Sequence, residues 1–215
     1  MELGKRYPWR YGVRYPLFCE IALDCYLIAQ KAYISLMEQP GEEPDTETFG
    51  LRDAVMKNCI ESICFSTMAL ESYINNYAAV YISQSFADAI DRLDIPAKWI
   101  VSIKMSINEE LKNGEAPLQK IAAVTKKRNG FVHSKSKNVQ VSEQGARIPI
   151  IDLRNDYMTP AYDGLCAIAE AADLIRSKCT PEYATICEED FVKKFNDHYK
   201  DVDVAWCFPE ESIIF

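Results

Sequence analysis

The residues best suited to chemistry in this chain lie in one short segment, Arg128-Asn129-Gly130-Phe131-Val132-His133. A histidine can accept or donate a proton near neutral pH. Arginine offers a planar fork of N–H donors that binds phosphate oxygens. On a helix Asn129 and His133 share a face, whereas Arg128 is rotated about 140° from His133. Acid–base chemistry on a phosphate group suits this set of side chains.

Basic side chains surround the segment. Residues 119–137 contain no acidic residue and six basic ones, here called the basic patch: Lys120, Lys126, Lys127, Arg128, Lys135 and Lys137. The whole chain has 24 basic and 32 acidic residues and a net charge of −8, so the other residues carry a net −14. A positive patch on an acidic body would draw a polyanion such as RNA to one place. A solvated helix face is the alternative explanation.

RNA cleavage without a metal needs a base for the 2′-hydroxyl proton, a cation beside the phosphate and an acid for the leaving oxygen. The chain has two histidines, and the second, His198, follows Asn196 and Asp197 and is expected on the surface. Because one histidine cannot fill both proton roles in one turnover, we expect a homodimer that places two copies of Arg128 and His133 around one phosphate. Asn129 would position His133, and the RNA backbone would be held by Lys126, Lys127, Lys135 and Lys137.

Two stretches resemble the HEPN superfamily. Arg128-Asn129-x-x-x-His133 is similar to its R-x(4–6)-H motif, and Ala69, Leu70, Glu71, Ile74 and Asn75 resemble its second long helix. The resemblance implies an all-α dimer that acts as a metal-independent endoribonuclease without a cofactor, in a toxin–antitoxin, antiphage or RNA-processing context, with an antitoxin or other partner protein. The alternative is a non-catalytic HEPN-like module that binds a partner protein or a nucleotide. Lys135 stands where one toxin branch of the family has a tyrosine.

Other residues have less specific roles. Glu71 and Asn75 are four residues apart on a predicted helix and could orient Arg128 or His133, or form a plain surface pair. The arm at residues 1–15 interleaves cations with aromatic rings, which suits either RNA stacking or packing over the end of a helical bundle. None of the eight cysteines lies in C-x-x-C spacing, so they predict reduced core residues and no metal site.

The elements that must position these residues are mostly helical. Helical spacing of apolar residues covers 18–36, 51–81, 86–93, 99–111, 117–133 and 165–175, with a polar helix at 188–199. Residues 138–153 alternate as a small β-hairpin would. We therefore predict an all-α bundle of five to seven helices with a β-hairpin insertion, forming one domain over 1–215 with an apolar tail at 201–215.

Composition and local sequence add further expectations. An apolar share of 48% is typical of globular chains, and no stretch reads as a membrane span or a secretory signal, so a cytoplasmic protein without membrane contact is expected. Within the motif, Phe131 and Val132 are the better core candidates. Gly130 would mark either a close backbone approach or a local helix end. The helix over 99–111 should end at Asn113-Gly114.

Overall fold

Six α-helices make up most of the chain that the computed structural model describes, namely residues 14–38, 46–108, 111, 114–133 and 152–178. In chain order they are α1 (Tyr15–Glu38), α2 (Thr46–Tyr81), α3 (Gln84–Ile90), α4 (Ile95–Ile107), α5 (Ala116–Val132) and α6 (Thr159–Lys178). A π-helical turn, η2 (Arg154–Met158), leads into α6. The predicted all-α class is confirmed, and no strand occurs among these residues.

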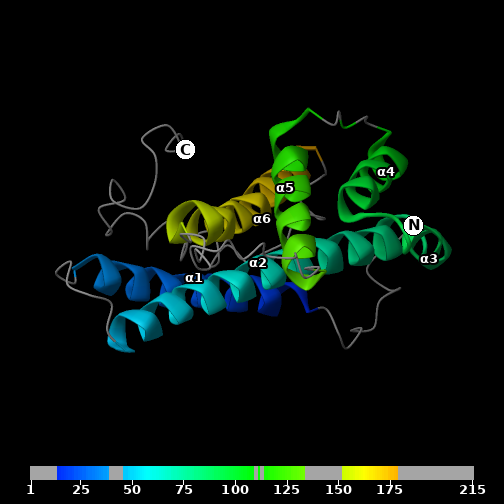
Figure 1. The fold of residues 1–215 in the computed structure, drawn as a ribbon. Coiled ribbons are helices and arrows are strands. Elements are labelled where there is room, and N and C mark those ends of the chain that lie inside the picture. Colours follow the sequence, from blue (N-terminus) through cyan, green and yellow to red (C-terminus); the bar gives the residue numbers. More distant parts are fainter. Residues whose placement is uncertain (1–13, 39–45, 109–110, 112–113, 134–151, 179–215) are drawn as a thin grey trace, which may run out of the picture.

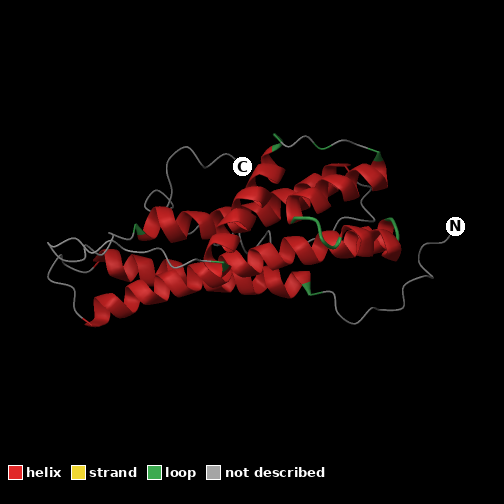
Figure 2. Ribbon diagram, turned by 45° about the vertical axis from the view of Figure 1, so that its right-hand side comes forward, coloured by secondary structure: helices red, strands yellow, loops and turns green. Residues whose placement is uncertain are grey.

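The two longest helices, α1 and α2, run antiparallel beside one another, and the other helices lie over them (Figures 1 and 2). With 36 residues, α2 is about 54 Å long, so it contacts every other helix. In Figure 1, α5 crosses α2 steeply. The crossing brings the basic patch of α5 to the middle of the longest helix.

Two side-chain caps define the helices at one end of α2. Ser83 accepts a hydrogen bond from the backbone N–H of Phe86 at the start of α3, and Asp94 accepts one from Ala97 at the start of α4. The predicted end of the fourth helix at Asn113-Gly114 is wrong. Asn108 takes the left-handed conformation (φ 57°, ψ 25°) and ends α4 there, a geometry that asparagine adopts more readily than most residues.

The core is one cluster of buried apolar side chains contributed by α1, α2, α4, α5 and α6. Trp99 of α4 is fully buried and stacks on Tyr73 of α2 at 5.7 Å between ring centroids. Gly164 of α6 lies against α2 and α5, since an added Cβ would lie 3.0 Å from Ser66 Oγ and 3.2 Å from Val124 Cγ2. A side chain at this position would therefore press on Ser66 of α2 and Val124 of α5, and glycine avoids this where the three helices meet.

The predicted hairpin falls mainly on residues 138–151, which lie outside the described residues. Its last residue, Leu153, is helical and buried, so the predicted boundary at 153 is wrong. Asp152 starts this helix by accepting hydrogen bonds from the Asn155 backbone (3.0 Å) and side chain (2.7 Å). The predicted helix at 188–199, the tail at 201–215 and residues 1–13 of the arm also lie outside the described residues.

Two further expectations bear on the described helices. None of them is long and apolar enough to cross a membrane. The expected core cysteines are confirmed where they can be seen, because Cys19, Cys25, Cys59 and Cys166 are buried as free thiols, and Cys64 is half-buried.

Candidate functional site

Helix α5 carries the motif residues at its last turn. Pro117 lies in the first turn, where its missing N–H is harmless, and the buried residues Leu118, Ile121, Val124 and Thr125 anchor the first half. Val124 packs at the Gly164 crossing, so the helix is fixed against α2 and α6 one turn before Arg128. A rigid helix therefore presents the motif to its surroundings.

Arg128 lies on the side of α5 that faces α2. It is half-buried, and its positive charge acts on the thiol of Cys64 in α2. Burial raises the pKa of that thiol, and Arg128 pulls it in the opposite direction. The guanidinium thus lies beside α2, and among the described residues it forms no ion pair with a carboxylate.

His133 is the residue that caps α5 at its C-terminal end. Its backbone N–H donates to the carbonyl of Asn129 at 2.9 Å, and its conformation (φ −112°, ψ 28°) is no longer helical. The side chains of Asn129 and His133 are exposed. Asn129 holds the backbone of His133, but no hydrogen bond joins the two side chains.

Phe131, between Arg128 and His133, fixes the end of the helix. Its ring stacks on Tyr157 of η2 at 5.8 Å and 19°, and Lys127 Nζ lies 5.4 Å from its centroid. Phe131 is partly buried against the core, as expected, but the prediction for Val132 is wrong because this side chain is 57% exposed. Nothing lies within 4 Å of a Cβ added at Gly130, and the helix continues to Val132, so neither role expected of this glycine is seen.

The basic patch divides in space. Lys126 is exposed and Lys127 half-buried, both beside Arg128 in sequence. Lys120 instead forms an ion pair with Glu170 of α6. Burial lowers the pKa of Lys120, but the hydrogen bond to Glu170 and nearby acidic groups outweigh this and raise it. Lys120 therefore stabilises the α5–α6 contact, whereas Lys135 and Lys137 lie outside the described residues.

The structure gives Glu71 a different partner from the one considered above. Its carboxylate accepts a hydrogen bond from Lys98 Nζ of α4 at 2.8 Å, so it orients neither Arg128 nor His133. Lys98 is 1% exposed, and its other acidic neighbour, Asp91, is 3.8 Å away. The side-chain oxygen of Asn75 is buried without a hydrogen bond among the described residues. Glu71 therefore links α2 to α4.

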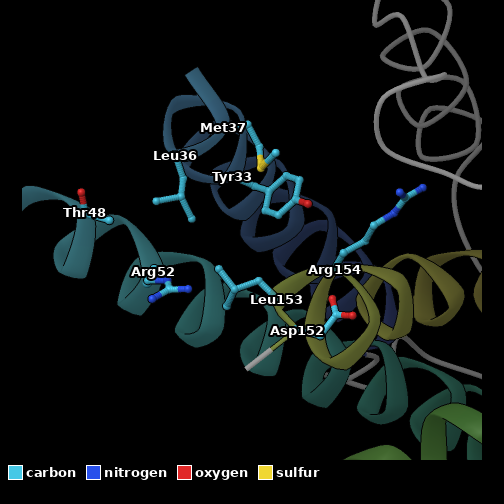
Figure 3. A pocket seen from close by; sticks show the side chains of 8 residues that line it. All are labelled: Tyr33, Leu36, Met37, Thr48, Arg52, Asp152, Leu153 and Arg154. Carbon is cyan, nitrogen blue, oxygen red and sulfur yellow. The ribbon is translucent and has the colours of Figure 1, made fainter. Parts of the chain in front are cut away.

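Sequence reasoning missed two features. Lys98 is one, although a signal existed, since Lys98 and Ser102 extend the buried stripe of α4 formed by Ile95, Trp99 and Ile103. The other is a cavity of about 360 Å³ between α1, α2 and the start of η2 (Figure 3). It includes Arg52 and Arg154 in its lining, which are 102 positions apart in the chain, and no sequence pattern links them.

The end of α5 can therefore offer a guanidinium, an imidazole and ammonium groups to an anionic ligand, over about 7.5 Å of helix axis between Arg128 and His133. Among the described residues no group of histidine, cysteine, aspartate and glutamate is arranged to hold a metal ion.

Comparisons of the chain with protein-family models, curated proteins and solved structures found no match.

Proposed function

We propose that the chain is a metal-independent endoribonuclease of HEPN type that works as a homodimer, in a toxin–antitoxin, antiphage or RNA-processing context. The observation that carries the proposal is the end of α5. Arg128 is half-buried beside Cys64 of α2, the next residue, Asn129, is exposed, and His133 is exposed just over one turn further on. The similarity of these residues to the R-x(4–6)-H motif supports the same function.

The proposed reaction is an attack by a ribose 2′-hydroxyl on the adjacent phosphorus. A P–O2′ bond forms, the P–O5′ bond breaks, and the products are a 2′,3′-cyclic phosphate and a 5′-hydroxyl. One imidazole removes the 2′-hydroxyl proton and another protonates the leaving 5′-oxygen. Arg128 stabilises the charge that develops on the phosphate oxygens, and Lys126, Lys127, Lys135 and Lys137 hold the flanking backbone.

The second imidazole is proposed to come from a second chain, because the other histidine, His198, follows Asn196 and Asp197 in sequence and lies outside the described residues. Exposed apolar side chains near the motif support such an association. Val132 is 57% exposed, and Met68, one turn beyond Cys64 on α2, is 43% exposed. A second copy that covered these side chains would bring its own α5 end to the same place.

The test is cleavage of a labelled single-stranded RNA in EDTA by the wild type, Arg128→Ala and His133→Ala. Each variant should lower kcat by about 10²- to 10⁴-fold. Arg92→Ala is the matched control, because Arg92 is exposed in the turn after α3 and should leave the rate unchanged. A 2′-deoxy substitution at the cleaved nucleotide should abolish the reaction, since it removes the nucleophile.

Equal rates for all variants would show that a contaminant cleaves the RNA. No cleavage by the wild type would favour the alternative, a non-catalytic HEPN-like module that binds a partner protein or a nucleotide. The dimer is tested separately by sedimentation, where Val132→Asp should shift the chain towards the monomer. Cleavage at undiminished rate by a monomer would contradict the composite site.

A further inference from the structure

Gly130 occupies a helical position that the described part of the chain does not account for. It lies in the last turn of α5, and glycine is less favourable inside a helix than every residue except proline. Its φ is outside the left-handed region, and nothing beyond its own helix lies within 4 Å of an added Cβ. Alanine would therefore fit at this position and would favour the helix, so neither backbone conformation nor packing among the described residues requires glycine.

Comparison with Gly50 shows what is particular about this position. Gly50 lies in α2, and an added Cβ there also meets nothing within 4 Å. An open glycine in a helix is therefore not a site by itself. The neighbours of Gly50 three positions away on either side are acidic, Glu47 and Asp53. Gly130 differs in the charge that surrounds it.

Basic side chains share the exposed face of α5 with Gly130. Lys126 and Lys127 precede it by four and three positions, and His133 follows it by three, so all three lie on its side of the helix. Lys126 and His133 are exposed. Lys127 Nζ lies 5.4 Å from the centroid of the Phe131 ring, so this side chain extends towards the last turn of α5. Helix α5 contains no acidic residue that would compete for these groups.

We propose that Gly130 is the point at which one phosphate group of a single-stranded RNA lies against α5. Because glycine has no Cβ, the phosphate can approach the helix surface between the ammonium groups of Lys126 and Lys127. The carbonyl groups at the C-terminal end of α5 oppose this approach with about half a negative charge. The two lysines bring two positive charges, which outweigh that opposition.

The phosphate at Gly130 is a neighbour of the one that is cleaved. Arg128 lies beside Cys64 of α2, on the side of α5 away from Gly130, so it stabilises charge on a different phosphate. His133 shares the face of Gly130, so a strand held there passes the imidazole. This inference rests on the proposed function in taking RNA as the ligand, and it assigns the path of the strand along α5 from Lys126 to His133.

The test is fluorescence anisotropy of a labelled single-stranded RNA in EDTA over a series of salt concentrations. The His133→Ala chain is used because it is expected to leave the RNA intact. Gly130→Leu in this chain keeps every charge of the protein, so a change in salt dependence reports a displaced phosphate. Loss of one phosphate contact should reduce the slope of log Kd against log salt concentration by about 0.7, or about fivefold in affinity at about 0.1 M salt.

Gly50→Leu in the same chain is the matched control. It adds the same side chain to an equally open helical glycine and should change neither the slope nor the affinity. Gly130→Ala should weaken binding less, by about two- to threefold, because its side chain is smaller. The same variant should raise the melting temperature by about 1–4 °C, since alanine favours the helix. A chain that is more stable and yet binds RNA less tightly does not owe the loss to misfolding.

Equal slopes for Gly130→Leu and Gly50→Leu would overturn the proposal, as would the absence of RNA binding by the His133→Ala chain. A changed sedimentation coefficient in Gly130→Leu with an unchanged slope would also overturn it, because this face would then contact protein. Cleavage is measured separately. If the wild type binds RNA through Gly130 without cleaving it, the phosphate contact is supported and the nuclease proposal is contradicted. If the wild type cleaves RNA and Gly130→Leu leaves both slope and rate unchanged, only the phosphate contact is contradicted.

Discussion

Removing the carboxylate of Glu71 should destabilise the fold through Lys98. The ammonium group of Lys98 is 1% exposed and lies 2.8 Å from Glu71 Oε1, which is its closest acidic partner. Asp91 is 3.8 Å away but 74% exposed, so solvent screens most of its attraction. In Glu71→Ala the chain must bury an almost unpaired charge beside Trp99, the adjacent buried residue of α4.

The magnitude follows from this geometry. Breaking a fully buried pair by removing one partner typically costs about 3–5 kcal/mol. Glu71 itself is 37% exposed, so water reaches the pair and reduces the loss to about 2–4 kcal/mol. For a chain of this length the melting temperature should fall by roughly 5–12 °C. Lys98→Met should cost about 1 kcal/mol or less, because the carboxylate that remains is partly hydrated.

Urea unfolding followed by circular dichroism and tryptophan fluorescence measures these differences. The double variant Glu71→Leu with Lys98→Met should recover most of the stability that Glu71→Ala loses. Asp173→Ala is the control, since it removes an exposed ion pair with Arg176 (2.8 Å) and should cost less than about 1 kcal/mol. A loss below about 0.5 kcal/mol in Glu71→Ala would refute the reasoning, as would equal losses for Glu71→Ala and Lys98→Met.

Two other predictions concern packing and pH. Gly164→Ala should destabilise the chain by about 1–2 kcal/mol, because contacts at 3.0–3.2 Å with Ser66 and Val124 outweigh the usual helical gain of alanine. Gly50→Ala, where nothing lies within 4 Å of the added Cβ, should instead stabilise the chain by about 0.5–1 kcal/mol. A thermal melt in which both variants gain stability would contradict this prediction. Burial raises the pKa of the Cys59 thiol from 9.0 to about 12 and that of the Cys166 thiol from 9.0 to about 11. The unfolded chain therefore loses these protons at a lower pH than the folded chain does. The free energy of unfolding should fall as the pH rises above 9, by about 1 kcal/mol per thiol at pH 10. Cys59→Ala should flatten that dependence between pH 8 and 10 in urea titrations, and an unchanged slope would show that other groups cause it.

The helical elements were predictable because apolar residues of each helix repeat at 3–4 positions. The pattern over 51–81 identified α2, and that over 18–36 identified α1, to within a few residues at most ends. The end of α4 was not predictable in the same way. Leu111 is buried and continues the apolar spacing, but it lies beyond the left-handed Asn108 that ends the helix. Apolar periodicity reports burial, and backbone conformation decides where a helix stops.

The candidate site was predictable in part. The sequence predicted Arg128, Asn129 and His133 on or at the end of one helix and Phe131 towards the core, but it wrongly predicted Val132 there too. The pairing of Glu71 with Lys98, and that of Lys120 with Glu170, depends on how α2 meets α4 and how α5 meets α6. Such long-range ion pairs leave no local pattern in a single sequence, so charge counted along the chain overstated the charge available at the patch.

The way α5 is fixed bears on how the proposed site would work. Val124 at the Gly164 crossing holds the helix before Arg128, and the stack of Phe131 on Tyr157 holds it after Arg128. The helix is thus held on both sides of Arg128, whereas His133 lies one residue beyond the last helical position and is exposed. A helix held in this way limits how far the base of the Arg128 side chain can move from a bound phosphate, and an exposed imidazole can exchange its proton with solvent between turnovers. The division of roles between Arg128 and His133 therefore follows from the packing of α5 as well as from the chemistry of the two side chains.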